Sequence, residues 1–184
     1  MKLTPQTIAD VILIEPTMLN DDRGYFMETF RQDLLENAVG YKVNFVQENE
    51  SKSTKGTLRG LHYQTAPFAQ AKLLSVTKGS VLDVAVDIRR SSSSFGHYVS
   101  VKLTEYNKQQ LFVPQGFAHG FVVLSDSATF TYKVDNYYAP KHDRGIAFDD
   151  KKLKIDWQFL VEDLQFSDKD KTHPTLEEAT DLFN

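Results

Sequence analysis

The sequence predicts an all-β fold, and three observations lead to that prediction. From about Leu58 to Val134 the chain is a series of short segments rich in β-branched and aromatic residues. Several of these segments alternate apolar with polar side chains, which is the period of a strand with one face on a core. Gly, Pro, Ser and Asn separate the segments at regular spacing, which favours a sandwich or barrel over alternating strands and helices.

Three segments give the clearest strand predictions, and turn signals lie between and after them. The predicted strands are Lys72–Val76, Val81–Ile88 and Tyr98–Leu103. The turn signals are Lys78–Ser80, the serine run Ser91–Ser94 closed by Phe95 and Gly96, and Glu105–Lys108. Arg89 and Arg90, just before the serine run, are interpreted as turn or interface residues.

Two short helices are expected outside these strands. Residues Arg31–Ala38, followed by Gly40, are typical of a short helix that a glycine ends. A second helix is expected over Leu176–Leu182, with Thr175 as its cap. The length of 184 residues supports one core, so we expect a single domain over residues 1–184.

Composition excludes several classes of function. The chain has 21 basic and 25 acidic residues mixed along its length, a net charge of -4, so we expect no nucleic-acid partner. It has no cysteine, hence neither disulfides nor a thiolate metal site. Polar residues interrupt the apolar ones near the amino terminus, and no run is long enough to span a membrane, so we expect no membrane association and a cytoplasmic location.

Three otherwise apolar segments carry a high density of reactive side chains. They are Arg59–Gln64, Pro114–Phe121 and Phe130–Lys133. Because buried polar groups cost free energy unless they are paired, a barrel lined with such groups is expected to bind a ligand.

The Pro-x-Gly-x-x-His pattern ending at His119 resembles the second motif of the cupin superfamily. His62 and Gln64 stand where the first motif would have a His-x-His pair, so the resemblance implies a jelly-roll β-barrel. Gln64 and Lys72 occupy positions where a metal-binding cupin would have ligands. A protonated ammonium cannot ligate a metal, so we expect no metal.

A longer set of motifs resembles the dTDP-4-dehydrorhamnose 3,5-epimerase family. These motifs run through nearly the whole chain in the family's order: Asp21–Phe30, Arg59–Gln64, Gln70–Leu73, Asp83–Gly96, Pro114–Phe121, Tyr132–Tyr138 and Ser167–Asp170. The resemblance implies an isomerase that converts dTDP-4-keto-6-deoxyglucose to dTDP-4-keto-rhamnose, in dTDP-L-rhamnose biosynthesis, without a cofactor.

The resemblance also implies catalytic roles for four residues. His62 would be the general base, Asp170 would hold its other ring nitrogen, and Tyr132 would be the acid on the far side of the sugar. Lys72 would stabilise charge on the C4 oxygen. Without the resemblance, Lys72 would be expected to face solvent, Tyr132 to be a core tyrosine, and Asp170, like Asp168, to lie in a solvated charged loop.

Substrate binding and assembly are assigned on the same resemblance. Arg23, Arg59 and Lys169 would pair with the diphosphate, and Gln47, Asn49 and Tyr138 would meet the thymidine. Asp143 is a further substrate contact, and His119 lies in the pocket wall unless it is a satisfied structural histidine. Phe26 and Glu28 would reach into a neighbouring subunit, which implies a homodimer with a shared active site. Strands before about residue 50 would then serve the dimer, residues from about 51 to 148 would form the barrel, and those from about 149 to 184 would cover it.

Three other functions stay open. A relative that inverts only C3 or only C5 would use the same base and pocket. A metal-dependent cupin would need ligands beyond His62 and His119, and the spacing of His97, His142 and His173 suggests none in the strands. A catalytically silent barrel would bind the sugar nucleotide without exchanging its hydrogens.

Overall fold

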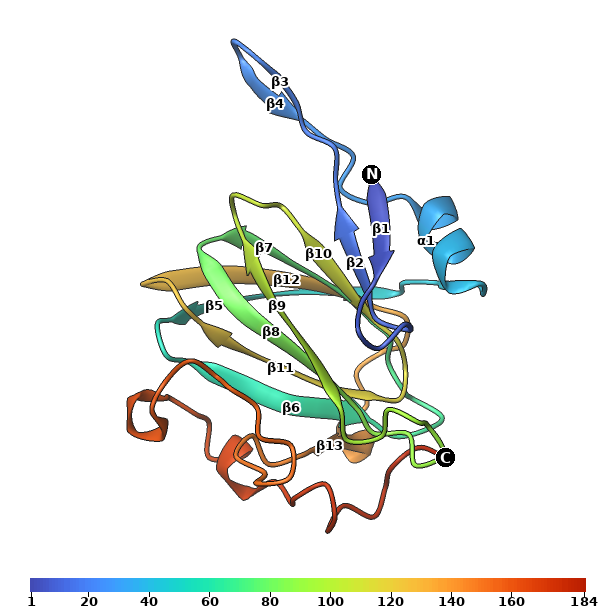
Figure 1. The fold of residues 1–184 in the computed structure, drawn as a ribbon, viewed down its shortest axis with the longest axis vertical. Coiled ribbons are helices and arrows are strands. Elements are labelled where there is room, and N and C mark those ends of the chain that lie inside the picture. Colours follow the sequence, from blue (N-terminus) through green and yellow to red (C-terminus); the bar gives the residue numbers. More distant parts are fainter.

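Two antiparallel sheets lie face to face and form the body of the molecule (Figure 1). The computed structural model describes residues 1–184. The large sheet has the order β1 (Lys2–Pro5), β2 (Ile12–Glu15), β10 (Gln110–Val113), β7 (Lys72–Lys78), β12 (Ser127–Val134) and β5 (Gln47–Thr54). The small sheet has the order β13 (Asp143–Gly145), β6 (Leu58–Gln64), β11 (Phe117–Val123), β8 (Ser80–Asp87) and β9 (Tyr98–Thr104).

The chain crosses repeatedly between the sheets: β5 and β6, β7 and β8, β9 and β10, and β11 and β12 each lie in opposite sheets. This is the jelly-roll arrangement, so the expected all-β, cupin-type fold is confirmed. The three predicted strands correspond to β7, β8 and β9. The predicted turns connect them, with Gly79 at φ +78° between β7 and β8.

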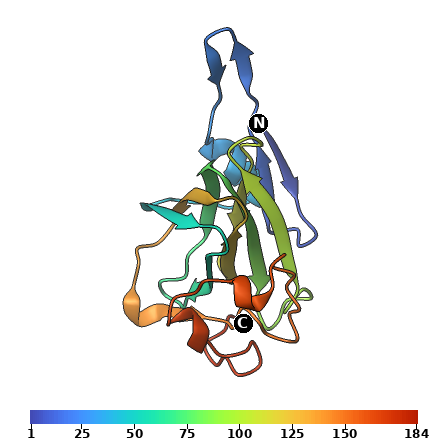
Figure 2. The same cartoon turned by 90° about the vertical axis from the view of Figure 1, so that its left-hand side faces the viewer.

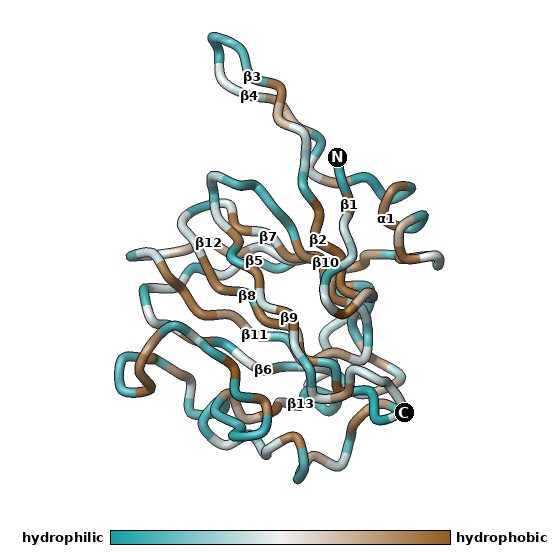
Figure 3. The backbone as a smooth tube through the Cα atoms, viewed as in Figure 1, coloured by the Kyte–Doolittle hydropathy of each residue, from teal (hydrophilic) through white to brown (hydrophobic).

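The small sheet is buried on both faces. Its inner face packs against the large sheet, and the shared core includes Ala85 and Phe121 of the small sheet and Phe130 of the large one. Its outer face packs on the carboxy-terminal segment, in a core that includes Val84, Val86 and Trp157. Two-sided burial explains why Val81–Ile88 is almost continuously apolar, and Figure 3 shows the hydrophobic residues gathered in the strands.

The predicted first helix is present as α1 (Gln32–Val39). Gly40 follows at φ +80° and donates its N–H to the Glu36 carbonyl at 2.8 Å, as a glycine cap does. Leu35 of α1 packs on Ile12 and Phe112, at the outer face of the large sheet.

The second predicted helix is wrong. Thr175 and Glu178 bond to each other like a helix cap, but only a single turn follows, at 176–178. The Arg90 side chain binds the Ala179 carbonyl, and its backbone N–H binds the Phe183 carbonyl at 2.8 Å. These tertiary contacts draw the chain end out of helical geometry. The segment from 149 onward otherwise has only short 3-10 turns, η2 (Val161–Asp163) and η3 (Asp170–Thr172), while η1 (Pro140–His142) precedes β13.

The hairpin of β3 (Leu19–Asp21) and β4 (Gly24–Phe26) projects away from both sheets in two perpendicular views (Figures 1 and 2). All six of its strand residues are exposed. No helix of the structure combines the length and the apolar character that crossing a membrane requires.

Candidate active site

His62 and Asp170 form a short polar contact in the barrel. His62 lies on β6, and its Nε2 is 2.5 Å from Oδ1 of Asp170 at the start of η3. The other carboxylate oxygen accepts a hydrogen bond from the Ser167 hydroxyl at 2.8 Å. Asp168, the alternative partner, points into solvent and pairs with Lys171. The structure therefore brings Asp170, and not Asp168, to the histidine.

The electrostatics of this pair fix the histidine tautomer. Burial alone would raise the pKa of Asp170, but contacts with His173, His62 and Ser167 outweigh it and hold that pKa well below its usual value. An ionised carboxylate only accepts hydrogen bonds, so His62 Nε2 carries the proton. The free nitrogen, Nδ1, can then act as a base.

β6 reaches this position because it runs very close to β11, where His119 is the direct neighbour of His62. Gly60 adopts φ +126°, and a Cβ on it would lie 2.5 Å from the Gly120 Cα. Only a residue without a side chain allows the two strands to approach in this way.

Lys72 is buried inside the barrel and not at its surface. Its side chain extends from β7, and Nζ donates to the backbone carbonyl of His62 at 3.3 Å. Burial lowers the pKa of Lys72 to about 8, although Asp83 and Asp143 favour its charged form. The interpretation from strand pattern alone, that this lysine faces solvent, is wrong because β7 turns it inward.

Tyr132 lies on the inner face of β12. Its neighbour Thr131 bonds to Ser75 at 2.7 Å on the outer face, and strand residues alternate sides. Its ring is tilted against Phe130, which belongs to the inner core. Burial raises the pKa of Tyr132, so its phenol stays protonated over a wider pH range than usual.

His119 is paired with a residue that the sequence analysis did not single out. Its Nε2 lies 3.0 and 3.1 Å from the two carboxylate oxygens of Asp83, which is fully buried on β8. Burial lowers the pKa of His119 despite the carboxylate. One signal could have identified Asp83: it is an acid in the middle of an otherwise apolar strand, and such an acid needs a partner.

Gln64, at the position of a cupin metal ligand, is engaged elsewhere. Its amide donates to the carbonyls of Phe68 and Tyr137 and accepts the N–H of Ala139. The side chain thus fixes the loop that follows β12.

Most of the residues predicted to bind the nucleotide form a connected group near Asp170. The Tyr138 hydroxyl donates to Asp143 at 2.9 Å, and Lys169 forms an ion pair with the same carboxylate. Gln47 accepts the backbone N–H of Tyr138 and donates to Asn49. Arg59 is exposed and held separately, by Ser53 at 3.1 Å.

Arg23, Phe26 and Glu28 are not brought to this site within one chain. Arg23 and Phe26 lie on the projecting hairpin, where Arg23 pairs with Asp21 at 2.6 Å. Glu28 follows the hairpin and pairs with Arg31 at 3.4 Å.

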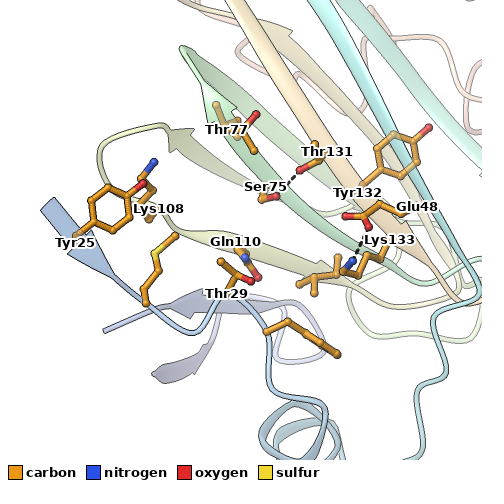
Figure 4. A pocket seen from close by; sticks show the side chains of 14 residues that line it. Tyr25, Thr29, Glu48, Ser75, Thr77, Lys108, Gln110, Thr131, Tyr132 and Lys133 are labelled. Atoms are coloured by element: carbon orange, nitrogen blue, oxygen red, sulfur yellow. Dashed lines mark hydrogen bonds and ion pairs between the residues drawn. The ribbon is translucent and has the colours of Figure 1, made fainter. Parts of the chain in front are cut away.

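A hollow of about 400 Å³ lies on the outer face of the large sheet (Figure 4). It is bounded by Tyr25 and Lys108 at the hairpin side and by Ser75 and Thr131 on the sheet. Ser75 and Thr131 bond to each other. Tyr132 borders it as well, but no histidine and no buried carboxylate lines it.

Three side chains are close enough together to be considered as a metal site. The possible ligand atoms of His62, Asp170 and His173 all lie within 4.8 Å of one another. However, the 2.5 Å between His62 and Asp170 is a hydrogen-bond distance. Two ligands on one tetrahedral zinc, each about 2.0–2.2 Å from it, would be roughly 3.3 Å apart. The group is therefore arranged for hydrogen bonding. The absence of a metal stays a prediction.

Comparison with known proteins agrees with this picture over almost the whole chain. The family model for dTDP-4-dehydrorhamnose 3,5-epimerase matches residues 5–178. A protein of that name from Shigella flexneri is 54% identical over 170 residues, covering 92% of this chain and 93% of its own. Another from Elizabethkingia anophelis has a crystal structure with a TM-score of 0.94 at 46% identity, covering 97% of both chains.

Two further structures bear on the ligand. A 3,5-epimerase from Legionella pneumophila, solved with dTDP-4-keto-L-rhamnose, is 45% identical with a TM-score of 0.92, covering 97% of this chain and 94% of its own. A 3′-monoepimerase from Streptomyces bikiniensis, solved with dTDP-quinovose, is 32% identical with a TM-score of 0.86, covering 95% and 87%. On the family model and these identities, the chain belongs to the dTDP-4-dehydrorhamnose 3,5-epimerase family.

Proposed function

We propose that this chain epimerises dTDP-4-keto-6-deoxy-D-glucose at C3 and C5, giving dTDP-4-keto-L-rhamnose for dTDP-L-rhamnose biosynthesis. The observation that carries the proposal is the His62–Asp170 pair, which presents a free imidazole nitrogen in the barrel that also holds Lys72. The C4 ketone of such a sugar acidifies the hydrogens on C3 and C5. Removal and return of a proton at each carbon therefore needs only an acid, a base and a stabilised enolate.

The four residues have distinct tasks in this reaction. His62 Nδ1 removes the proton, and Asp170 stabilises the resulting imidazolium. The Lys72 ammonium balances the negative charge that develops on the C4 oxygen, and its burial strengthens that interaction. Tyr132 returns a proton to the opposite face of the ring, and its raised pKa keeps the phenol in the acid form.

The nucleotide is proposed to lie across the group that extends from Gln47 to Lys169. Lys169 and Arg59 would supply positive charge for the diphosphate, and Asn49 and Tyr138 are the proposed contacts of the thymidine. Asp143 holds Lys169 and Tyr138 in place, and His119 with Asp83 closes the wall of the pocket.

We propose a homodimer that completes the site. An isolated two-stranded hairpin is at best marginally stable, and this one exposes Leu19, Tyr25 and Phe26. A second copy that receives the hairpin would bury them and bring Arg23, Phe26 and Glu28 to its pocket. We also propose a cytoplasmic location, because a charged nucleotide sugar does not cross a bilayer unaided.

A one-centre epimerase is the second candidate, favoured by the likeness to the 3′-monoepimerase. The test is conversion of dTDP-4-keto-6-deoxy-D-glucose by purified, metal-analysed protein in the presence of EDTA, with NMR identification of the product. The proposal expects the L-rhamno product and no dependence on metal. An epimer at one carbon would identify the second candidate. A requirement for metal would identify a metal cupin, and binding without turnover would identify a silent barrel.

A further inference from the structure

His173 is a buried imidazole next to the proposed catalytic pair. It follows η3, and its side chain is only 8% exposed. Its Nε2 is buried without a hydrogen-bond partner, and it lies 3.5 Å from Oδ1 of Asp170, the same oxygen that contacts His62. A buried polar atom without a partner costs free energy and calls for an explanation.

The ring of His173 is held in place on two sides. It packs against Gly145 on β13, where a Cβ would lie 2.4 Å from the ring, so only glycine leaves room for it. It also meets the ring of His62 in a T-shaped arrangement, at a centroid separation of 5.6 Å and an interplanar angle of 82°. The imidazole therefore cannot turn away from Asp170 without disturbing both neighbours.

The negative charge on Asp170 determines whether a protonated Nε2 of His173 is favoured. An unprotonated nitrogen would point its lone pair at a carboxylate and be repelled, whereas an N–H is attracted to it. At 3.5 Å the contact is longer than an ordinary hydrogen bond.

We propose that His173 is a positioning residue for the general base. Its Nε2–H acts on Asp170 from the side opposite Ser167, and keeps Oδ1 aimed at His62 while His62 takes up and releases protons. This inference rests on the proposed function, since it assigns His173 a part in the same acid/base pair. The carboxylate would then be held by three donors, namely His62, His173 and Ser167.

Two substitutions distinguish the role of the His173 N–H from the role of the packing of its ring. His173→Phe keeps a flat ring over Gly145 but has no donor, whereas His173→Gln offers an amide N–H near the position of Nε2. We expect His173→Phe to lower kcat about tenfold with little change in KM, the scale of one hydrogen bond to a charged group. His173→Gln should recover most of the loss. His97→Phe, at an exposed position, is the matched control and should behave as wild type.

A second readout does not depend on turnover. The short His62–Asp170 hydrogen bond should give a low-field proton NMR signal in the substrate-free protein. We expect this signal to weaken or shift in His173→Phe and to return in His173→Gln. If wild type has no epimerase activity, the proposed function fails while this signal still decides the role of His173.

Two outcomes would overturn the inference. One is a His173→Phe protein with wild-type kcat and an unchanged low-field signal. The other is a His173→Gln protein as impaired as His173→Phe, because the ring's packing, and not its N–H, would then be what matters.

Discussion

His62 and Tyr132 act at different stages, so their loss should have different consequences. With Nε2 bonded to Asp170, His62 has one nitrogen free to remove a proton. We expect His62→Ala to abolish measurable solvent exchange at both C3 and C5, because the exchange rate should fall by at least about 10²-fold to 10⁴-fold. Proton NMR of the substrate in heavy water measures this directly.

Tyr132→Phe tests the role of the acid, as His62→Ala tests the role of the base. Removing the acid leaves the base in place, so some exchange should continue while inversion is rarely completed. Full turnover in both variants would show that the assignment of base and acid is wrong.

Lys72 gives the reaction a distinctive pH dependence. Its pKa is lowered to about 8 by burial, so the ammonium loses its proton at a pH well below that of an ordinary lysine. The reaction needs the charged form, and kcat/KM, which reports the ionisation of the free enzyme, should therefore fall as pH rises through about 8. Tyr132 cannot account for this fall, because burial raises the pKa of its phenol from the ordinary tyrosine value, which is already more alkaline than this range.

Replacing Lys72 tests that explanation. Lys72→Met should lower kcat by about 10²-fold to 10³-fold, as loss of an oxyanion-stabilising group does, and should remove the alkaline decline. Lys102→Met, at an exposed position of β9, is the control and should keep both the rate and the decline. An alkaline decline that persists in Lys72→Met would assign it to another group.

At the residue scale, motif resemblance predicted more than strand pattern did. Pattern alone placed Lys72 in solvent and Asp170 in an open loop, yet both are buried. Which face of a strand meets the pocket, and where a charged loop folds back, depend on tertiary packing. The same reason hid Asp83, whose partner His119 is 36 residues away. It also hid His173, which is three positions from Asp170 but meets His62, 111 positions earlier, only in the folded chain.

Among the elements, the β3–β4 hairpin is the one that has no partner in its own chain. If it completes the pocket of a second copy, two different defects should complement each other. A His62→Ala chain has an intact hairpin, and a Phe26→Ala chain has an intact base. Co-expressed as a mixed dimer, they would form one complete site and one doubly defective site.

The expected recovery is therefore about a quarter of the wild-type sites when the two chains pair at random. Each variant alone should show less activity than the mixture. A monomer by light scattering, or a mixture no more active than the average of the separate variants, would contradict the shared site.

The loop between β8 and β9 depends on Asp87. Although burial opposes ionisation of this carboxylate, bonds from Arg89, Ser92 and Ser94 lower its pKa to about 2. We expect Asp87→Ala to lower the free energy of unfolding by about 2–3 kcal/mol in urea titrations, because it leaves buried donors unpaired.

The sign of the pH effect follows from that lowered pKa. The stabilisation from Asp87 is fully present above its unfolded pKa, near 4, and is lost as pH falls toward about 2. Wild type and Asp87→Ala should therefore converge in stability over that range. A constant difference down to pH 2 would mean that charge on Asp87 is not the cause.

The two predicted helices show when a local sequence signal is sufficient to form an element. Helix α1 forms as predicted because a local signal, Gly40, coincides with the packing of Leu35. The helix expected after Thr175 has the local capping signal as well. It fails because Arg90 binds the backbone at Ala179 and Phe183, contacts that come from a loop nearly 90 residues earlier.

In the whole molecule, the two sheets of the barrel contribute different parts of the proposed site. The small sheet is covered on both faces and carries His62, His119 and Asp83, so these groups are held rigidly. The large sheet contributes Lys72 and Tyr132, and its outer face carries the hollow beside the hairpin (Figure 4). The strand pattern predicted the strands of this core well, whereas only the family resemblance implied that the carboxy-terminal segment covers the barrel and supplies Asp170.

The barrel is proposed to exchange protons at two carbons beside a ketone. The most direct test is proton NMR of dTDP-4-keto-6-deoxy-D-glucose in heavy water with the purified protein and no added metal. Deuterium should enter at both C3 and C5 as the L-rhamno product forms, and His62→Ala should prevent both. A wild-type protein that binds the sugar nucleotide while both hydrogens stay in place would contradict it.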